Sequence, residues 1–507
     1  MKSSAEQSLK LPVGWLVSAL GDIATFEMGQ APAGAASNFN GVGTVFVKAG
    51  EFGLAEPIVR EWTTEPKKYA KNGDVLICVV GATAGKLNFG IDCAIGRSVA
   101  AIRPEIGVKQ KTIYFQLLPN VERMRANVSG SAQGVISQAD LSRLVLRVPP
   151  AAEQTRIVEK LEELLSDLDA GVAELKVAQK KLAQYRQSLL KAAVEGALTA
   201  DWRAARGLAN EEAETGAQLL ARILTERRSR WQVRQLAKFQ AQGKAPPKDW
   251  QAKYPAPVAP GTNGLPELPQ GWVWVTVDQL AHVGTGVTPL RSNVAYFDGG
   301  TIPWVTSGAL NSETVTGANE QVTTLAAQQC RLELYPAGSL LLAMYGEGKT
   351  RGKCAELLIA ATINQAIAAI VLEPSAQGCK AYLKTFLLKS YEKMREQAVG
   401  GVQPNLNLQI VKSICFPLPP MSEQTEINRT LDERFEQVSQ QKMALEISLK
   451  QSSAQRKNIL QAAFSGQLVP QDPADEPASA LLARIRVERA GRGAGFARVR
   501  GRKTVAM

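Results

Sequence analysis

The segment Pro149-Pro150-Ala151-Ala152-Glu153-Gln154-Thr155 recurs as Pro419-Pro420-Met421-Ser422-Glu423-Gln424-Thr425, with each residue number raised by 270. The match continues without a gap over residues 129–200, which realign on residues 399–470. A repeat of this length is a whole domain with a helix attached rather than a solenoid module, so we expect an approximate internal two-fold. Such a molecule offers two places to bind a ligand.

Each repeat opens on a short motif and carries a β-rich lobe. Leu11-Pro12-Val13-Gly14-Trp15 recurs as Leu268-Pro269-Gln270-Gly271-Trp272. Between this motif and the double proline, short apolar runs separated by Gly and Pro are typical of strands. The runs are Thr44–Val47, Asp74–Val80, Ser98–Arg103 and Leu144–Val148 in the first lobe, and Ile302–Thr306, Ser339–Met344, Ala366–Leu372 and Ile414–Leu418 in the second. These runs predict two similar lobes of α+β (mixed α/β) class.

A leucine heptad follows the first double proline, and a weaker one follows the second. The seam positions are Leu161, Leu168, Leu175, Leu182 and Leu189 in the first copy, and Leu431, Val438, Leu445 and Ile459 in the second. This spacing predicts two coiled-coil helices, the first over Glu153 to about Val194 and on the order of 60 Å long. We expect Ser422 to be the N-cap of the second helix and Gly196 to end the first.

Two such helices in one chain can bury their seams on each other. If the repeats are related by a two-fold, the helices pack antiparallel and form a rigid spacer with a lobe at each end. Before the first double proline, Ser137 and Asp140 have the spacing of a helix capping box. Glycine-rich turns precede these segments at Ser129-Gly130-Ser131 and Gly400-Gly401.

The formal net charge of +12 is spread unevenly along the chain. Residues 261–420 are neutral, whereas residues 201–260 carry +5 and residues 484–507 carry +7. Basic surfaces bind phosphate by releasing counterions. The lobes can therefore bind DNA only if charge is clustered on one face of each, or if a partner completes the clamp.

Both basic segments begin with a similar sequence, Ala217–Arg228 and Ser479–Ala490 respectively, so each repeat is expected to end in a short helix with basic residues. The first continues with mixed basic and aromatic residues and then prolines, which favours a solvated amphipathic helix and a proline linker. Direct DNA contact and docking on a partner subunit are the alternatives. The glycines in Arg492–Lys503 favour disorder.

Catalytic and metal-binding signatures are sparse. The six cysteines form no Cys-x-x-Cys pair and His282 is the single histidine, so reduced and mostly buried thiols are expected. Residues 343–350 fit a relaxed phosphate-loop pattern, but Ala343 replaces the first glycine and Gly352 interrupts the helix that should follow. No apolar run is long enough to span a bilayer. We expect a cytoplasmic binding protein.

The chain resembles the specificity subunit of Type I restriction-modification enzymes. The resemblance is carried by Leu-Pro-x-Gly-Trp at the start of each lobe, Pro-Pro-x-x-Glu-Gln at its end, and a long helix ending in Ala-Ala-x-x-Gly-x-Leu. It implies target-recognition domains at residues 1–152 and 268–420, long helical spacers at 153–200 and 421–470, a basic and aromatic helical segment with a proline-rich linker at 201–267, and a short helix with an Arg/Gly-rich tail at 471–507.

The resemblance also implies a non-catalytic role in phage defence. Its partners would be double-stranded DNA, two methyltransferase subunits and the restriction/translocase subunits. S-adenosylmethionine, ATP and Mg would be used only by those partners, and this chain would hold no cofactor. A specificity subunit for a methyltransferase-nuclease fusion, or a non-catalytic DNA-binding coiled-coil scaffold, are the alternatives.

Candidate base-reading residues lie in or beside glycine-rich loops that follow strands. Arg and Lys suit guanine, whereas Asn and Gln suit adenine. The candidates for DNA binding are Lys86, Arg97, Lys349, Arg351 and Lys353, and solvated charge is the alternative role for each.

Overall fold

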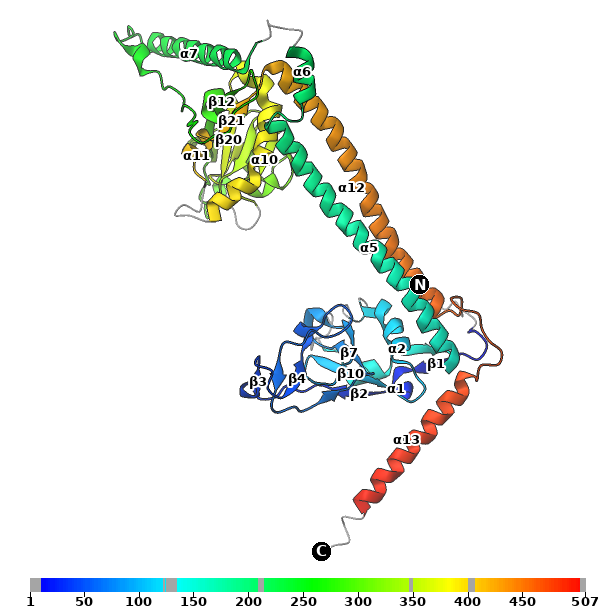
Figure 1. Cartoon of the computed structure of the whole chain (residues 1–507). Helices are drawn as coiled ribbons and strands as arrows, with labels where there is room; N and C mark the ends of the chain where they lie inside the picture. The colour runs from blue at the N-terminus through cyan, green and yellow to red at the C-terminus, as the bar shows by residue number, and fades with distance from the viewer. Residues whose placement is uncertain are drawn as a thin grey trace, which may run out of the picture. The chain divides into compact units, whose positions relative to one another are not determined.

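The computed structural model describes residues 11–121, 124, 135–207, 214–345, 350–399 and 406–501. The chain divides into two compact units (Figure 1). Unit 1 contains residues 1–177 and 445–507, and unit 2 contains residues 178–444. The glycine-rich turns expected at residues 129–131 and 400–401 lie outside the described residues.

Two long helices, α5 (Ala151–Val194) and α12 (Met421–Ala463), contribute residues to both units. Their span agrees with the predicted coiled-coil segments. The remaining elements of unit 1 are β1 (Leu16–Ala19), α1 (Leu20–Ile23), β2 (Ala24–Met28), η1 (Gly34–Ala36), β3 (Ser37–Asn38), β4 (Thr44–Val47), η2 (Ala49–Glu51), β5 (Trp62–Thr63), β6 (Tyr69–Ala70), β7 (Val75–Cys78), η3 (Gly81–Thr83), β8 (Leu87–Phe89), β9 (Cys93–Ile95), β10 (Val99–Pro104), α2 (Gln110–Leu117), η4 (Leu118–Asn120), α4 (Gln138–Ser142), β11 (Val145–Val148) and α13 (Ala478–Gly501).

Unit 2 repeats this order with extra helices at its beginning. Its elements are α6 (Ala200–Gly207), α7 (Gly216–Ala241), η5 (Trp250–Lys253), β12 (Val273–Thr276), α8 (Val277–Leu280), β13 (Ala281–Thr285), η6 (Val294–Tyr296), β14 (Ile302–Val305), η7 (Ser307–Asn311), β15 (Thr314–Val315), β16 (Glu320–Val322), α9 (Thr324–Gln329), β17 (Leu340–Ala343), β18 (Cys354–Leu357), β19 (Thr362–Ile363), β20 (Ile367–Leu372), η8 (Pro374–Cys379), α10 (Lys380–Val399), α11 (Leu408–Lys412) and β21 (Cys415–Leu418).

Every strand run expected from the sequence is a strand in the structure, and the sheets of the two lobes correspond. The main sheet has the order β2-β10-β7-β8 in unit 1 and β13-β20-β17-β18-β15 in unit 2. In both lobes a strand pair joins the start to the end, β1 with β11 and β12 with β21, and both pairs are antiparallel. The α+β class with two similar lobes is thus confirmed.

The opening motif and the double-proline motif of each lobe meet through a buried hydrogen bond. The indole Nε1 of Trp15 donates to the Glu153 carboxylate at 2.8 Å, and Trp272 donates to Glu423 at the same distance. Both carboxylates are almost fully buried. The glutamine that follows each carboxylate donates to the first proline carbonyl of the pair, at 3.0 Å in one lobe and 2.9 Å in the other. These contacts explain why the two motifs recur together: they close the lobe at its junction with the long helix.

The two long helices run antiparallel within each unit. In unit 1, Ile157 and Leu161 of α5 share a core with Leu460 of α12. In unit 2, Leu189 of α5 shares a core with Leu431 of α12. Further along α5, Asp169 pairs with Arg456 in unit 1, and in unit 2 Arg186 lies 4.9 Å from the Phe435 ring centroid. Within each unit the α12 number therefore falls as the α5 number rises, which is the antiparallel sense that Figure 1 also shows. All nine seam positions are buried or half-buried, with Leu161, Leu189, Leu431 and Val438 the most buried.

The ends of the long helices depart in detail from the expectation. Gly196 and Gly466 both have φ of +77°, the left-handed conformation that glycine adopts at a helix end. The expected N-cap at Ser422 is wrong, because α12 begins one residue earlier, at Met421. The proline carbonyl of Pro420 accepts hydrogen bonds from the backbone N–H groups of Glu423 and Gln424, so the double proline itself starts the helix.

The helix that follows each spacer is longer than the sequence indicates. Helix α7 has 26 residues. Helix α13 has 24 residues and reaches Gly501, which contradicts the disorder expected from Arg492 onward. The reason lies in unit 1, where Arg489 and Arg492 both bind the buried Glu105 carboxylate, with Arg489 Nε 2.8 Å from Glu105 Oε1. This anchor offsets the cost of the nearby glycines, about 1 kcal/mol each in a helix interior.

None of the described helices is long and apolar enough to cross a bilayer.

The capping box expected at residues 137–140 is present, since Ser137 Oγ accepts from the Asp140 backbone N–H at 3.2 Å and Asp140 accepts from the Ser137 N–H at 2.9 Å.

Candidate nucleic-acid interface

Four loops of the first lobe meet where strands β2, β4, β7 and β9 end. The Gln30 N–H donates to the Ile95 carbonyl at 3.0 Å, and the Gly96 N–H donates to the Val47 carbonyl at 2.9 Å. Ser98 joins the other two loops, because its hydroxyl accepts from the Ala49 N–H at 3.1 Å and its carbonyl from the Val79 N–H at 2.9 Å. We name this set of loops the loop cluster of lobe 1.

The second lobe builds the equivalent cluster with other side chains. The Asn364 N–H donates to the Val305 carbonyl at 3.0 Å, and the Met344 N–H donates to the Ala366 carbonyl at 2.8 Å. The Gln365 side chain accepts from the Thr288 N–H at 3.2 Å, which brings in the loop after β13. Backbone hydrogen bonds, together with one side-chain acceptor in each lobe, Ser98 and Gln365, therefore fix a similar four-loop arrangement in both lobes.

Arg97 and Gln365 occupy the same place in the two clusters. Val47 pairs with Ile95 in parallel register, and Val305 pairs with Ile363 in the same way. Each candidate stands two residues after the paired isoleucine. Both side chains are exposed, and Arg97 has no hydrogen-bond or ion-pair partner in the described parts of the chain. The sequence identified Arg97 but missed Gln365. The residues of these two loops are not separated by the 270 positions that separate the two double-proline motifs, so the repeat does not align them.

Lys86 and Lys353 also turn out to be equivalent to each other. Lys86 precedes β8 and its carbonyl accepts from Cys78, whereas Lys353 precedes β18 and its carbonyl accepts from Ala343. Each ammonium group is used within its lobe. Lys86 Nζ donates to the Phe52 carbonyl at 2.7 Å, and Lys353 Nζ donates to Asn311 Oδ1 at 2.6 Å. Both lysines thus tie the loop after the central strand to the segment that follows β4 or β14.

The remaining candidates lie in the β17–β18 loop. Lys349 is outside the described residues. Arg351 is half-buried, and its Nε is buried without a hydrogen-bond partner in the part of the chain that the structure describes. The loop leads into β18, which pairs antiparallel with β17. A phosphate loop needs a helix at this point, so the geometry excludes one here.

A cavity of about 280 Å³ opens beside the loop cluster of lobe 2. Its wall includes hydroxyl and amide groups as well as the buried Trp304 ring, and the polar members are Thr306, Ser312, Thr314, Thr316, Asn319 and Glu320. Glu320 is held by Arg291, whose guanidinium also lies 5.2 Å from the Trp304 ring centroid. The cavity thus places hydrogen-bonding groups next to Thr306 of the cluster.

The described residues show no metal-binding cluster. No group of three or more His, Cys, Asp or Glu side chains among them is arranged to hold an ion. All six cysteines are free thiols, four buried and two half-buried, as expected. Burial raises the pKa of Cys93 and Cys354 to about 12, which keeps both thiols protonated and unreactive at neutral pH.

Comparison with known proteins identifies the family. The family described as Type I restriction modification DNA specificity domain matches residues 12–175 and 269–450. The EcoDI specificity subunit of Escherichia coli is 25% identical over 497 residues, which cover 96% of this chain and 97% of the relative. The StySPI specificity subunit of Salmonella potsdam is 22% identical over 432 residues, covering 82% and 79%.

A solved structure shares the fold. It belongs to a structural description of complex assembly and conformational transition in the type I R-M system, and it aligns with a TM-score of 0.63 at 18% identity, covering 90% of this chain and 99% of that chain. The family matches both lobes, each with the adjoining part of its long helix. The chain therefore belongs to the family of Type I restriction-modification specificity subunits, the non-catalytic subunits that recognise DNA for partner methyltransferase and restriction subunits.

Proposed function

We propose that the chain recognises a bipartite and asymmetric duplex DNA site, with one half-site read by each lobe. The residue ranges 1–152 and 268–420 are the two recognition domains in this proposal. The observation that supports it is the pair of loop clusters, which share one backbone arrangement but carry different exposed side chains. A shared backbone arrangement with different exposed side chains suits a DNA site whose two halves differ in sequence.

Arg97 and Gln365 are the first base-reading residues of the proposal. Arginine donates in bidentate fashion to guanine, and glutamine pairs with adenine in the major groove. Gln365 Oε1 also accepts from the Thr288 N–H, so its exposed Nε2, which has no partner among the described residues, is the group left to donate to a base. Lys86 and Lys353 act by holding the loops, since their ammonium groups bind within the lobe. Lys349 and Arg351 remain proposed DNA contacts of the second lobe.

Helices α5 and α12 set the separation between the half-sites and carry the docking surfaces for two methyltransferase subunits and for the restriction/translocase subunits. S-adenosylmethionine, ATP and Mg are bound by those partners, in the cytoplasm. Co-purification tests this part, because two methyltransferase copies per chain are expected. A single methyltransferase-nuclease fusion partner, or no partner, would favour the alternatives named above.

Substitution of the two exposed readers tests the assignment of half-sites. Each good bidentate base contact is worth about 1–3 kcal/mol of discrimination. We expect Arg97→Ala to relax one base of one half-site and Gln365→Ala to relax one base of the other, in the methylation pattern of a host that expresses the complex. Relaxation of both halves by one substitution, or of neither by both, contradicts the assignment.

A further inference from the structure

Helix α7 and the segment that returns from it form a strongly basic feature of unit 2. Residues 216–254 contain nine Lys and Arg against two Asp and Glu. Residues 261–420, which form most of the lobe beside it, have no net charge. Positive charge is therefore concentrated outside the lobe that carries the loop cluster.

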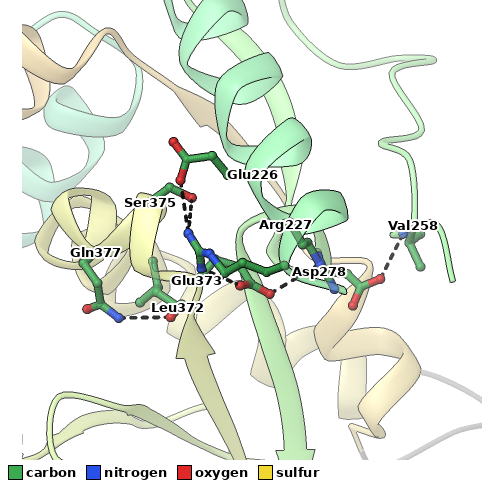
Figure 2. A network of polar contacts seen from close by, with 9 residues as sticks. Glu226, Arg227, Val258, Asp278, Leu372, Glu373, Ser375 and Gln377 are labelled. Atoms are coloured by element: carbon green, nitrogen blue, oxygen red, sulfur yellow. Dashed lines mark hydrogen bonds and ion pairs between the residues drawn. The ribbon is translucent and has the colours of Figure 1, made fainter. Parts of the chain in front are cut away.

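The base of α7 is fixed to the lobe by a polar network (Figure 2). Arg230 Nη1 donates to Glu373 at 3.3 Å, and Arg227 Nε lies 3.5 Å from the same carboxylate. Arg227 also donates to the Asp278 carbonyl, and the Asp278 carboxylate accepts from the Val258 N–H at 2.9 Å. Together with the buried Leu219 and Ile223, these contacts fix both the helix and the later end of the returning chain.

An aromatic cluster fixes the far half of the feature. Trp231 stacks on Trp250 with ring centroids 5.7 Å apart, and the Tyr254 ring meets Trp231 at 5.3 Å. Phe239 meets Trp250 at 6.0 Å. The segment after α7 is thus folded back along the helix, which a solvated linker has no need to do. Figure 1 shows α7 extending past the strands of its lobe.

The cations of this feature divide into two sets. Of the four near its base, Arg222, Arg227 and Arg230 bind carboxylates, and Arg228 lies 5.7 Å from the Tyr254 ring centroid. Five further along are exposed and have no side-chain partner among the residues that the structure describes: Arg234, Lys238, Lys244, Lys248 and Lys253. Arg234 and Lys238 share one helix face at a spacing of four residues. Like charges at this spacing destabilise the helix, so an anionic partner would relieve the repulsion.

We propose that residues 216–254 form a basic arm that binds the phosphate backbone of duplex DNA next to the half-site of the second lobe. The proposal rests on the proposed function and deepens it. A neutral lobe supplies base contacts but little counterion release, and the arm supplies the missing electrostatic part of the affinity. An acidic protein partner is less suited, because Val233 and Leu236 are the large apolar side chains that the arm exposes, too few for a protein interface core.

The equivalent helix of unit 1 has the same design. In α13, Arg489 and Arg492 bind Glu105, in the way that Arg227 and Arg230 of α7 bind Glu373. Beyond this anchor the sequence of α13 continues with Arg498 and Arg500. Each lobe is thus flanked by a helix that is tethered by an arginine pair and continues with basic residues.

Salt titration of the intact complex tests the arm. The variant replaces Lys238, Lys244 and Lys248 by Gln. The control replaces Lys71, Lys109 and Arg143 by Gln; these residues are exposed, their replacement removes the same charge, and they lie outside the arm, the loop cluster and the two long helices. The probes are a duplex with the site found by methylome sequencing and a scrambled duplex. We expect the arm variant to weaken both equally and to lower the slope of log Kd against log salt by roughly 2 to 3 units. The control should change neither the affinity for the two duplexes nor the slope.

A second variant separates the arm from its charge. Trp231→Ala with Trp250→Ala leaves every cation in place but releases the returning segment, and we expect a smaller loss of affinity with the same ratio between the two duplexes. An unchanged slope in the lysine variant overturns the proposal. So does loss of a partner subunit from the purified complex at an unchanged slope, which would assign the arm to protein docking. If the unaltered complex fails to distinguish the two duplexes, the proposed function fails instead.

Discussion

Glu153 and Glu423 accept the same indole hydrogen bond in equivalent places, but among the described residues only Glu423 forms an ion pair, with Arg203, because Arg156 near Glu153 binds Asp475. The second oxygen of Glu423 accepts from Thr199 Oγ1 at 2.7 Å and from Arg203. The second oxygen of Glu153 is buried without a partner in the described residues. Burial raises the pKa of Glu153, so the folded chain binds a proton there more readily than the unfolded chain does. This contribution to stability is present at low pH and is lost as the pH rises through the raised value.

The matched substitutions Glu153→Gln and Glu423→Gln should therefore have different effects. A glutamine at position 153 can still accept from Trp15 and removes a poorly solvated charge. We therefore expect Glu153→Gln to change the free energy of unfolding by less than about 1 kcal/mol at about pH 8, and to remove the pH dependence of stability that Glu153 contributes. Glu423→Gln leaves Arg203 without its carboxylate and should cost about 2 kcal/mol. Thermal unfolding of the full chain between about pH 5 and about pH 8 measures both. Equal losses at all pH values would contradict the contrast.

The long helices were the most predictable elements, because a seven-residue leucine step depends on local spacing alone. The strands were also predictable from short apolar runs. The contacts that close each lobe were not, because Trp15 and Glu153 are 138 positions apart and neither residue signals its partner. A helix was expected at α7, but the folding back of the segment after it was missed for a similar reason, because Trp250 contacts the helix from outside it. At the loop clusters, insertions between the lobes hid the equivalence of Lys86 with Lys353.

Replacing a seam leucine by alanine should lower the free energy of unfolding by an amount that depends on its position along the helix. Leu161 is fully buried in the core of unit 1, whereas Leu175 is half-buried midway along α5. We expect Leu161→Ala to cost about 3 kcal/mol and Leu175→Ala about 1 kcal/mol or less, as measured by urea unfolding of the full chain. Leu431→Ala, at 2% exposure in unit 2, should match Leu161→Ala. A uniform cost at the three positions would show that the helices are packed evenly instead.

Lengthening both helices together tests their role as a ruler. A seven-residue insertion between Val177 and Ala178 and another between Ala444 and Leu445 would keep the seam in phase. Seven residues add about 10 Å, or about three base pairs at about 3.4 Å each. We expect the methylated site to keep both half-sites and to gain about that many unread bases between them. Methylome sequencing that found an unchanged spacer would refute the ruler.

At the scale of the whole molecule, the helix that follows each spacer packs on the lobe of the other repeat. Helix α7 follows the first spacer and packs on the lobe of unit 2, whereas α13 follows the second spacer and packs on the lobe of unit 1. The hydrogen bonds that attach them match, from the Gly216 N–H to the Gly271 carbonyl at 2.7 Å and from the Ala478 N–H to the Gly14 carbonyl at 2.8 Å. Each lobe is therefore completed by the helix of the other repeat, and the frame is more symmetric than the sequence order indicates.

The central claim is that this symmetric frame holds two different DNA readers. Methylome sequencing of a host that expresses the chain with its methyltransferase partner tests this claim most directly. The account predicts a single methylated motif with two unlike half-sites separated by a fixed run of unread bases. A continuous motif, or two identical half-sites, would contradict it.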